Sequence, residues 1–384
     1  MQSINVVALG HQVTWLSFGL GVVFGSTAQR SHFCTMGALT DVFNMGDWNR
    51  MRQWVLAMAV AILGTSLLAA SGAIDPAKSL YTSVRLNWLS HLTGGTCFGF
   101  GMVLASGCGN KTLVRVGSGN LKSLVVFIVL GLTAFMTLKG VLAIPRSQLL
   151  DTHFITFATD QDLPSIAAGK VVARNYHDGA GALLAHMQLL IGGTAALALL
   201  FFVFSDRAFR SRDVFARHVI SGVIIGSIIV AAWYISGSIG HVAEDPESLQ
   251  EIFVATNSGR MESFSFVAPF AYTLDLLMMW TDVSKRVSFG IAAALGVAVG
   301  SFIMAITNGT FRWEGFGSVE DVGNHIAGAT LMGFGGVTAL GCTIGQGLSG
   351  MSTLSIGSFL TVGGIVGGAY VATRYQNWRM DRQG

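Results

Sequence analysis

The chain alternates long apolar runs with short polar segments. An apolar run of about 20 residues is long enough to cross the hydrocarbon core of a bilayer as a helix, and a helix satisfies its own backbone hydrogen bonds there. The pattern predicts an all-α polytopic membrane protein with about nine transmembrane helices. The predicted spans are residues 13–28, 52–72, 91–107, 121–144, 182–204, 218–239, 286–306, 325–341 and 355–373.

Two further segments are too short and too polar to span a bilayer comfortably. They are residues 31–46 and 265–280, and we expect each to form a short or re-entrant helix. Around them the chain divides into three parts. Residues 1–145 hold four spans and the first short helix. Residues 146–217 hold an extramembrane loop, a connecting span and an arginine-rich loop, and residues 218–384 hold four spans and the second short helix.

One stretch of sequence occurs twice. HLTGGTCFGFGMVLASGCGNKTLVR begins at His91, and HIAGATLMGFGGVTALGCTIGQGLSG begins at His325, 234 residues later. Each copy ends an apolar, glycine-rich run in Gly-Cys, at Cys108 and at Cys342. An odd number of spans precedes the second half, so we expect two inverted pseudo-symmetric repeats. Duplicated, broken hydrophobic segments of this kind indicate a transporter binding site.

The composition supports a membrane protein. Only 11% of the 384 residues are charged, against about 25% in soluble domains, so the lipid bilayer is the expected surrounding. The net charge of +3 comes from short loops rather than a continuous patch, and nucleic acid is not an expected partner. Arginines in the loop 205–217 predict its cytoplasmic location. The N-terminus lacks a charged n-region, so we expect the first span to be retained.

Four cysteines carry the candidate chemistry: Cys34, Cys97, Cys108 and Cys342. Their spacing matches no zinc motif, so no metal or other cofactor is expected. Glycines beside Cys108 and Cys342 let a helix unwind where its backbone faces a cavity. A thiol is soft and a weak hydrogen-bond donor, which suits a sulfur-bearing substrate better than a hard oxyanion. The alternative is that these side chains only fill the core.

The other two cysteines are placed differently. Cys97 precedes Cys108 by eleven residues, which on a continuous helix returns to nearly the same face, about 16 Å away. Cys34 lies in the short segment 31–46, and its thiol would be a third contact for the substrate, near one mouth of a pathway. Core packing is the alternative for both.

Polar residues follow the two breaks. Asn110 and Lys111 come directly after Cys108 and would attract an anion. The alternative is that Lys111 anchors a cytoplasmic loop. In the second copy Gln346 would offer only neutral hydrogen bonds, so a charge-based attraction is expected on one side.

Three more residues are candidates. Arg30 flanks the short segment and would serve as a gate or a substrate contact, or form a salt bridge with Asp41. His91 and His325 open the two copies of the repeat. A histidine at the end of a span acts either as an interfacial residue or as a ligand or proton carrier, and both interpretations stay open.

The segments RSHFCTMGAL, GFGMVLASGCGNK and GFGGVTALGCTIGQ resemble the YeeE/YedE family of bacterial sulfur-compound transporters. The resemblance covers both halves. It implies nine membrane helices in an hourglass, and thiosulfate passing along pathway cysteines in the bacterial cytoplasmic (inner) membrane. Cys108 and Cys342 match the paired cysteines, whereas Cys34 has Ala268 at the corresponding place of the second half. The resemblance also implies a TusA-type small sulfur-carrier protein as a partner.

The expected function is therefore import of thiosulfate or a related small sulfur-containing anion, not enzymatic catalysis. Two alternatives belong to other classes. A membrane thiol/disulfide oxidoreductase would want a close pair such as CxxC, which the chain lacks. A gated anion channel needs no thiols, so its cysteines would be structural.

Overall fold

The computed structural model describes residues 6–172, 180–206, 209, 212–245, 249–282 and 285–383. Among these residues, seven helices are long and apolar enough to cross a membrane. They are Val6–Met45, Asn49–Ala70, Leu121–Lys139, His186–Phe204, Arg217–Ile239, Phe289–Thr307 and Ile356–Arg382. An all-α polytopic membrane protein is thus confirmed, while the predicted number of about nine spans is not.

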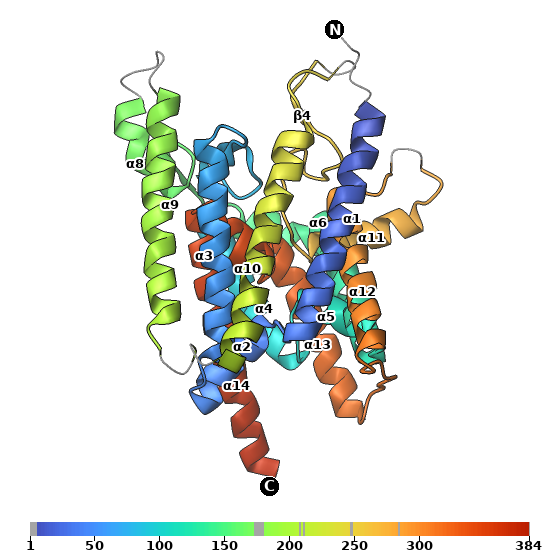
Figure 1. Ribbon diagram of the computed structural model, residues 1–384. Coiled ribbons are helices and arrows are strands. Elements are labelled where there is room, and N and C mark those ends of the chain that lie inside the picture. The colour runs from blue at the N-terminus through green and yellow to red at the C-terminus, as the bar shows by residue number, and fades with distance from the viewer. Residues whose placement is uncertain are drawn as a thin grey trace.

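The two other predicted spans form helices of a different character. α4 (Trp88–Leu104) is short, and α13 (Val319–Thr338) begins with the charged residues Glu320 and Asp321. Neither therefore offers a long uninterrupted apolar stretch of its own. Both lie inside the bundle, where other helices cover them (Figure 1).

The remaining long helices surround this pair. Figure 1 shows an elongated bundle with the N-terminus at one end and the C-terminus at the other. The long helices are α1 (Val6–Ser31), α3 (Asn49–Ala70), α6 (Leu121–Lys139), α9 (Ala180–Phe204), α10 (Arg212–Tyr234), α12 (Phe289–Thr307) and α14 (Ile356–Gln383). α9 packs on α3 at the edge of the bundle.

Short elements lie between the long helices. The two short segments expected from the sequence each contain one helix, α2 (Thr35–Met45) and α11 (Ala268–Met278). Two elements were not predicted: α5 (Gly109–Gly117), directly after Cys108, and α8 (Leu163–Val172), inside the predicted loop. The other short helical elements are η1 (Pro76–Lys78), α7 (Ala143–Pro145), η2 (Arg146–Leu150), η3 (Ile235–Ile239) and η4 (Gly345–Gly350).

Two small antiparallel ladders tie loops together at the end of the bundle that carries the N-terminus. β1 (Arg85–Leu86) pairs with β2 (Ile155–Thr156), and β3 (His241–Val242) pairs with β4 (Ile252–Phe253).

Glycines bring α4 and α13 into backbone contact at the centre. A side-chain carbon added at Gly101 would lie 2.6 Å from the carbonyl oxygen of Gly328, and one at Gly94 would lie 2.7 Å from that of Gly335. These distances are too short for any other residue, so only glycine permits this approach. Gly94 corresponds to Gly328 in the duplicated stretch, and Gly101 to Gly335. The contact is therefore reciprocal.

Reciprocity extends to the neighbouring helices. α14 packs along α4, and α6 packs along α13; likewise α12 packs along α1 and α10 along α3. The pair α4–α14 in one half of the relation corresponds to the pair α13–α6 in the other, and the pair α1–α12 corresponds to α10–α3.

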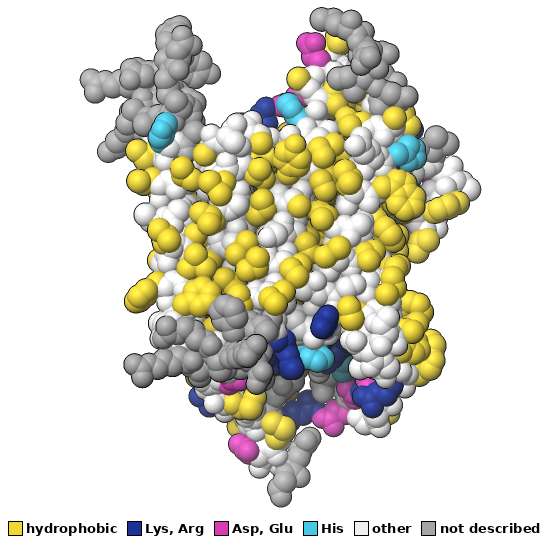
Figure 2. Space-filling model, in the orientation of Figure 1, with side chains coloured by type: hydrophobic (Ala, Val, Ile, Leu, Met, Phe, Trp, Pro, Cys, Tyr) yellow, Lys and Arg dark blue, Asp and Glu magenta, His cyan; other side chains and the backbone are white. Residues whose placement is uncertain are grey.

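The outer surface of the bundle is apolar around its waist. Figure 2 shows a broad hydrophobic band across the middle, with most Lys and Arg side chains gathered at the end that carries the C-terminus. On the membrane-length helices α1 and α9, Trp15, Leu197 and Phe201 are 70%, 67% and 79% exposed. Such a continuous apolar face requires lipid rather than water around it.

Candidate functional site

The two central helices end in the same way. Ser106 and Leu340, the residues before Gly-Cys in each copy, adopt left-handed backbone conformations with φ of 54° and 59°. In both helices the following glycine amide bonds a carbonyl five residues back: Gly107 to Met102 and Gly341 to Gly336, both at 2.8 Å. This is the Schellman ending of a helix. It turns the chain sharply, so each cysteine lies beyond its helix.

The break changes the position of Cys97. Cys97 is on α4, but α4 ends at Leu104 and Cys108 belongs to the next element. The expectation that Cys97 and Cys108 share one face of a continuous helix is therefore wrong. Cys97 is partly exposed and lies against α13 near Gly335.

The other three cysteines each begin a helical turn. The sulfur of Cys34 accepts a hydrogen bond from the amide of Gly37 at 3.4 Å, and the sulfur of Cys342 accepts one from Gly345 at 3.4 Å. The sulfur of Cys108 faces the amide of Lys111 in the same way. All three cysteines are buried. The amide groups at a helix N-terminus favour negative charge, so each thiol lies where an anion would be stabilised.

Two of these thiols adjoin, although 74 residues separate them. The thiols of Cys34 and Cys108 lie within hydrogen-bonding reach of one another. The hydroxyl of Thr343 approaches the Cys108 thiol from the second half, but it forms no hydrogen bond with any of the described residues. Cys342 directly precedes Thr343 in the chain, so the two helix breaks lie next to each other.

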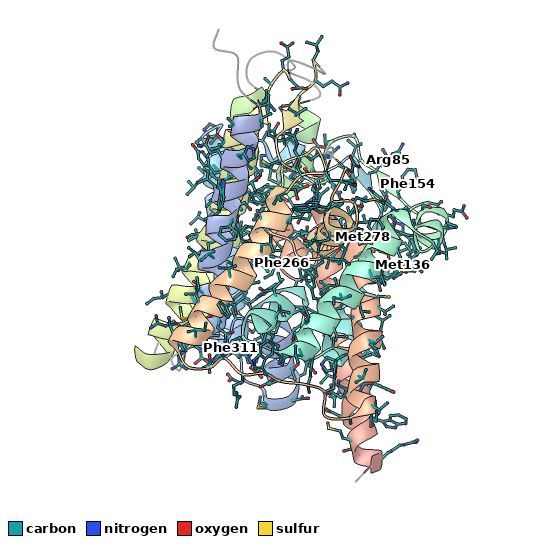
Figure 3. All side chains as sticks on the ribbon, turned by 90° about the vertical axis from the view of Figure 1, so that its right-hand side faces the viewer. Arg85, Met136, Phe154, Phe266, Met278 and Phe311 are labelled. Atoms are coloured by element: carbon teal, nitrogen blue, oxygen red, sulfur yellow. The ribbon has the colours of Figure 1, made fainter. Side chains whose placement is uncertain are left out.

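The three thiols of Cys34, Cys108 and Cys342 form a row, and beyond Cys342 hydroxyl groups extend it. The Ser265 hydroxyl contacts both the Cys342 thiol and the phenol of Tyr81. The backbone amide of Phe266, which lies in the interior at mid-height (Figure 3), also faces Cys342. Tyr81 and Ser265 then line a cavity of about 200 Å³ that also includes Gly341. Loop residues and residues of α6, α11, α12 and α13 together form the cavity.

Cations gather at the opposite end of the row. Lys111 is half-buried and interacts electrostatically with the thiols of Cys34 and Cys108. The Arg50 guanidinium lies against Gly37, beside Cys34, and forms a salt bridge with Asp41 at 2.8 Å. This end is therefore suited to an anion. The sequence did not identify Arg50 as a candidate. The signal that could have identified it is its position at the start of a span, soon after a short helix.

Asn110 is a buried polar residue whose side chain needs a hydrogen-bond partner. Its side chain is 1% exposed, and neither the amide nitrogen nor the carbonyl oxygen of that side chain has a hydrogen-bond partner among the described residues. Burying such a group without a partner is unfavourable. Its position directly after Cys108 means that a polar molecule at this thiol could provide one.

Several predicted residues have other uses. The amide of Gln346 is fully engaged: its nitrogen donates to the Ala339 carbonyl, and its oxygen accepts from Ser358. Arg30 is exposed, and the proposed Arg30–Asp41 salt bridge is wrong because Arg50 pairs with Asp41.

The two repeated histidines lie apart from the cysteines. His91 is buried and bonds the Thr361 hydroxyl at 2.8 Å. His325 is buried and bonds the Asp321 carbonyl at 2.7 Å. The first contact joins α4 to α14 and the second lies within α13; the role of both histidines stays a prediction.

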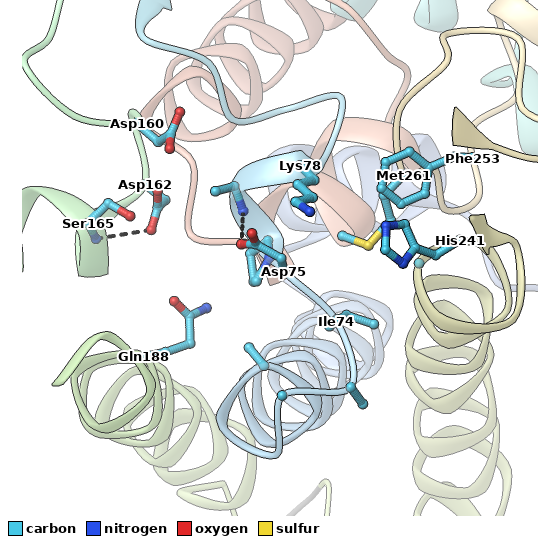
Figure 4. Close-up of a pocket in the computed structure, with 16 residues that line it drawn as sticks. Ile74, Asp75, Lys78, Asp160, Asp162, Ser165, Gln188, His241, Phe253 and Met261 are labelled. Carbon is cyan, nitrogen blue, oxygen red and sulfur yellow. Dashed lines mark hydrogen bonds between the residues drawn. The ribbon is translucent and has the colours of Figure 1, made fainter. Parts of the chain in front are cut away.

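A second, larger pocket of about 490 Å³ lies among the loops near β3 (Figure 4). Asp75, Asp160, Asp162 and Gln188 line it, and burial raises the pKa of both Asp160 and Asp162. No cysteine lines this pocket. Within the described ranges no cluster of three metal-ligating side chains is present here or elsewhere.

Comparison with known proteins fits this arrangement. The model of the Sulphur transport family matches residues 30–371, which include both breaks and all four cysteines. The chain belongs to this family. The resemblance to sulfur-compound transporters is thus confirmed, and with it a transporter rather than an enzyme.

Individual relatives of this Sulphur transport protein extend over most of its length. "Thiosulfate transporter TsuA" of Escherichia coli (strain K12) is 24% identical over 337 residues, which cover 85% of this chain and 84% of the relative. "Thiosulfate transporter TsuA" of Spirochaeta thermophila is 24% identical over 354 residues, covering 90% and 94%. A shorter match, 27% identical over 116 residues and 30% of this chain, is to "Probable transporter YedE" of Escherichia coli (strain K12), of which it covers 27%.

Proposed function

We propose that this protein imports thiosulfate or a related small sulfur-containing anion across the bacterial cytoplasmic membrane. One observation carries the proposal: buried thiols and hydroxyls lie between the cavity at Tyr81 and the cations at Lys111. In this pathway the anion meets Cys342, then Cys108 and Cys34. The names of the two full-length relatives support thiosulfate as the substrate.

The chemistry of the row fits a sulfur anion. Thiosulfate carries a soft terminal sulfur that accepts the weak hydrogen bonds of thiols. The helix N-termini behind Cys34, Cys108 and Cys342 stabilise its negative charge without a fixed cation deep in the membrane. The unpartnered Asn110 side chain provides a further hydrogen-bond donor, which suits the oxygens at the other end of the ion. A sulfate ion offers no such soft atom.

The direction and topology follow from charge and symmetry. We infer nine crossings in two inverted repeats, which the reciprocal contacts of α4 with α13 support. Basic residues concentrate at the end that carries the C-terminus (Figure 2), so this end is cytoplasmic. The anion then enters from the Tyr81 cavity and leaves beside Lys111.

Uptake of a dianion against an inside-negative potential is uphill by about 4.6 kcal/mol at about 100 mV. Removal of the product or a coupled cation must offset this cost. A TusA-type sulfur carrier at the Lys111 side would remove the product: its thiolate would take the terminal sulfur as a persulfide, and sulfite would leave. We propose such a carrier as the cytoplasmic partner.

One observation favours a second function. The neighbouring thiols of Cys34 and Cys108 form the kind of cysteine pair that a thiol/disulfide oxidoreductase would use. All four cysteines are free thiols in this structure, and membership of a transport family weighs against this alternative.

Uptake of sulfane-labelled thiosulfate tests the proposal. Cells that lack other sulfur importers and express this chain should accumulate the label, and unlabelled thiosulfate should compete whereas a large excess of sulfate should not. No accumulation, or equal competition by sulfate, would overturn the thiosulfate assignment. Transfer of electrons between thiols without accumulation of the label would instead favour the oxidoreductase.

A further inference from the structure

Glu262 is a half-buried carboxylate in the wall of the entry cavity. It lines the 200 Å³ space together with Tyr81 and Ser265, the two hydroxyl groups that lead to Cys342. The proposed pathway therefore brings a doubly negative ion into a cavity that already contains a carboxylate.

The surroundings of Glu262 do not neutralise it. Its Oε1 accepts hydrogen bonds from the amide of Ser258 at 2.9 Å and from the Ser258 hydroxyl. Among the described residues no Lys, Arg or His lies within salt-bridge distance of this carboxylate. The cation in the same cavity is Arg146, and it pairs with Asp151 at 3.6 Å.

The other titratable and charged neighbours can be named element by element. Tyr81, from the segment before β1, and Tyr272, on α11, both feel the negative charge of Glu262. Arg260, on the same loop, points its guanidinium away to the carbonyls of Ser79 and Thr82. Cys342 lies behind Ser265.

These surroundings favour a neutral Glu262. Burial raises the pKa of the carboxyl above its usual range, and the Ser258 hydrogen bonds oppose this only in part. A dianion in the same cavity would disfavour the carboxylate further, since like charges repel. By thermodynamic linkage, binding of the anion and protonation of Glu262 therefore favour each other.

We propose that Glu262 takes up one proton from the outer solution as the sulfur anion enters, and that this proton crosses the membrane with the anion. This inference rests on the proposed function. The carboxylate becomes a carboxylic acid on loading and returns to a carboxylate on release, so each transported anion is accompanied by one proton. The hydroxyls of Tyr81 and Ser265 lead from the cavity to the Cys342 thiol, and Thr343 and Cys108 lie next along the path that we propose for that proton.

Proteoliposomes containing the full chain test the proposal. A pH-sensitive dye is trapped inside, the membrane potential is clamped with potassium and valinomycin, and labelled thiosulfate is added outside. Wild-type uptake should acidify the interior in step with entry of the label. Each pH unit above the pKa of a carboxyl lowers its protonated fraction about tenfold, so uptake should fall about tenfold per pH unit once the pH exceeds the pKa of Glu262.

Two variants make the test specific to Glu262. Glu262→Gln keeps an oxygen that accepts the Ser258 hydrogen bonds, and it should let thiosulfate flow down its gradient without acidification and without the fall in rate at high pH. Ser258→Ala removes a hydrogen bond that favours the carboxylate, so the decrease in uptake rate should begin at a higher pH. The matched control is Asp160→Asn. The pKa of Asp160 is also raised by burial, but it lines the other pocket and should keep the wild-type profile.

The outcomes separate the two proposals. Thiosulfate uptake by wild type with no dye response, or a Glu262→Gln profile that matches wild type, overturns the proton proposal and leaves the proposed function in place. A pH profile that shifts with Asp160→Asn instead also overturns it. A wild-type protein that takes up no thiosulfate overturns the proposed function and the proton proposal together.

Discussion

The thiol of Cys108 in the first half of the chain contacts the hydroxyl of Thr343, which directly follows Cys342 in the second half. The contact joins two helix breaks that are far apart in sequence, and it places a hydroxyl between the two cysteines of the duplicated motif. Thr343 is 1% exposed, so its hydroxyl has no water to bond. We therefore expect it to bond the substrate as the substrate passes from one half to the other.

Replacing Thr343 by valine tests this relationship. Valine has nearly the same shape but no hydroxyl, so folding should be preserved while thiosulfate uptake falls about tenfold, the effect of one lost hydrogen bond. Initial rates of labelled uptake, normalised to the amount of inserted protein, measure it. The control is Thr338→Val, because the Thr338 hydroxyl bonds the carbonyl of Phe334 within its own helix. Equal rates for the two variants would contradict the role of Thr343.

Lys111 should attract the anion at the end of the proposed pathway that lies opposite the Tyr81 cavity. Lys111→Gln removes a half-buried charge next to two thiols, so the KM for thiosulfate should rise about tenfold, in line with a hydrogen bond to a charged group. Lys111→Arg should retain more activity. Arg30→Gln serves as the control, since Arg30 is exposed. If Arg30→Gln weakens uptake as much as Lys111→Gln, the attraction is not specific to Lys111.

The glycine contact between α4 and α13 should be essential for stability. Gly101→Ala would place a methyl group 2.6 Å from a backbone oxygen of Gly328, so the helices must separate, at a cost of about 1–3 kcal/mol. The Tm of the purified protein in detergent should fall. Gly367→Ala on α14 meets nothing within 4 Å and should leave the Tm unchanged. An unchanged Tm for both variants would show that the contact is looser than described.

The loops that carry β3 and β4 should be less stable in acid. Hydrogen bonds from Lys78 and then His241 hold the pKa of Glu251 below its ordinary value of 4.5. A lowered pKa means that this stabilisation is fully present above about pH 4.5 and is lost as the pH falls through the folded value. Hydrogen exchange at β3 and β4, relative to intrinsic rates, should therefore increase in acid. Glu251→Gln should remove the pH dependence; if the variant keeps it, another group is responsible.

The sequence was sufficient for the membrane fold and the family, because both depend on local patterns. Apolar runs of spanning length identify membrane helices whatever their packing, and the Gly-Cys motifs around Cys108 and Cys342 are specific enough to indicate sulfur transport. The inverted arrangement, the nine crossings and the thiol pathway remain predictions.

The detailed geometry of the site could not be predicted, because it depends on contacts between distant segments. Nothing in the sequence indicates that Cys34 adjoins Cys108, or that Ser265 and Tyr81 extend the row beyond Cys342. The error about Cys97 has a local cause. Ser106 occupies a left-handed position normally given to glycine, so the end of α4 was placed too late, at the glycine that follows it.

Uptake of sulfane-labelled thiosulfate by Cys108→Ser and Cys342→Ser tests the thiol pathway most directly. Serine keeps a small hydrogen-bonding side chain but removes the soft sulfur. Both variants should insert normally and lose nearly all uptake, whereas Cys97→Ser, which lies outside the row, should transport like wild type. Uptake that survives both substitutions would contradict the thiol pathway and leave the cysteines as packing residues of an anion channel.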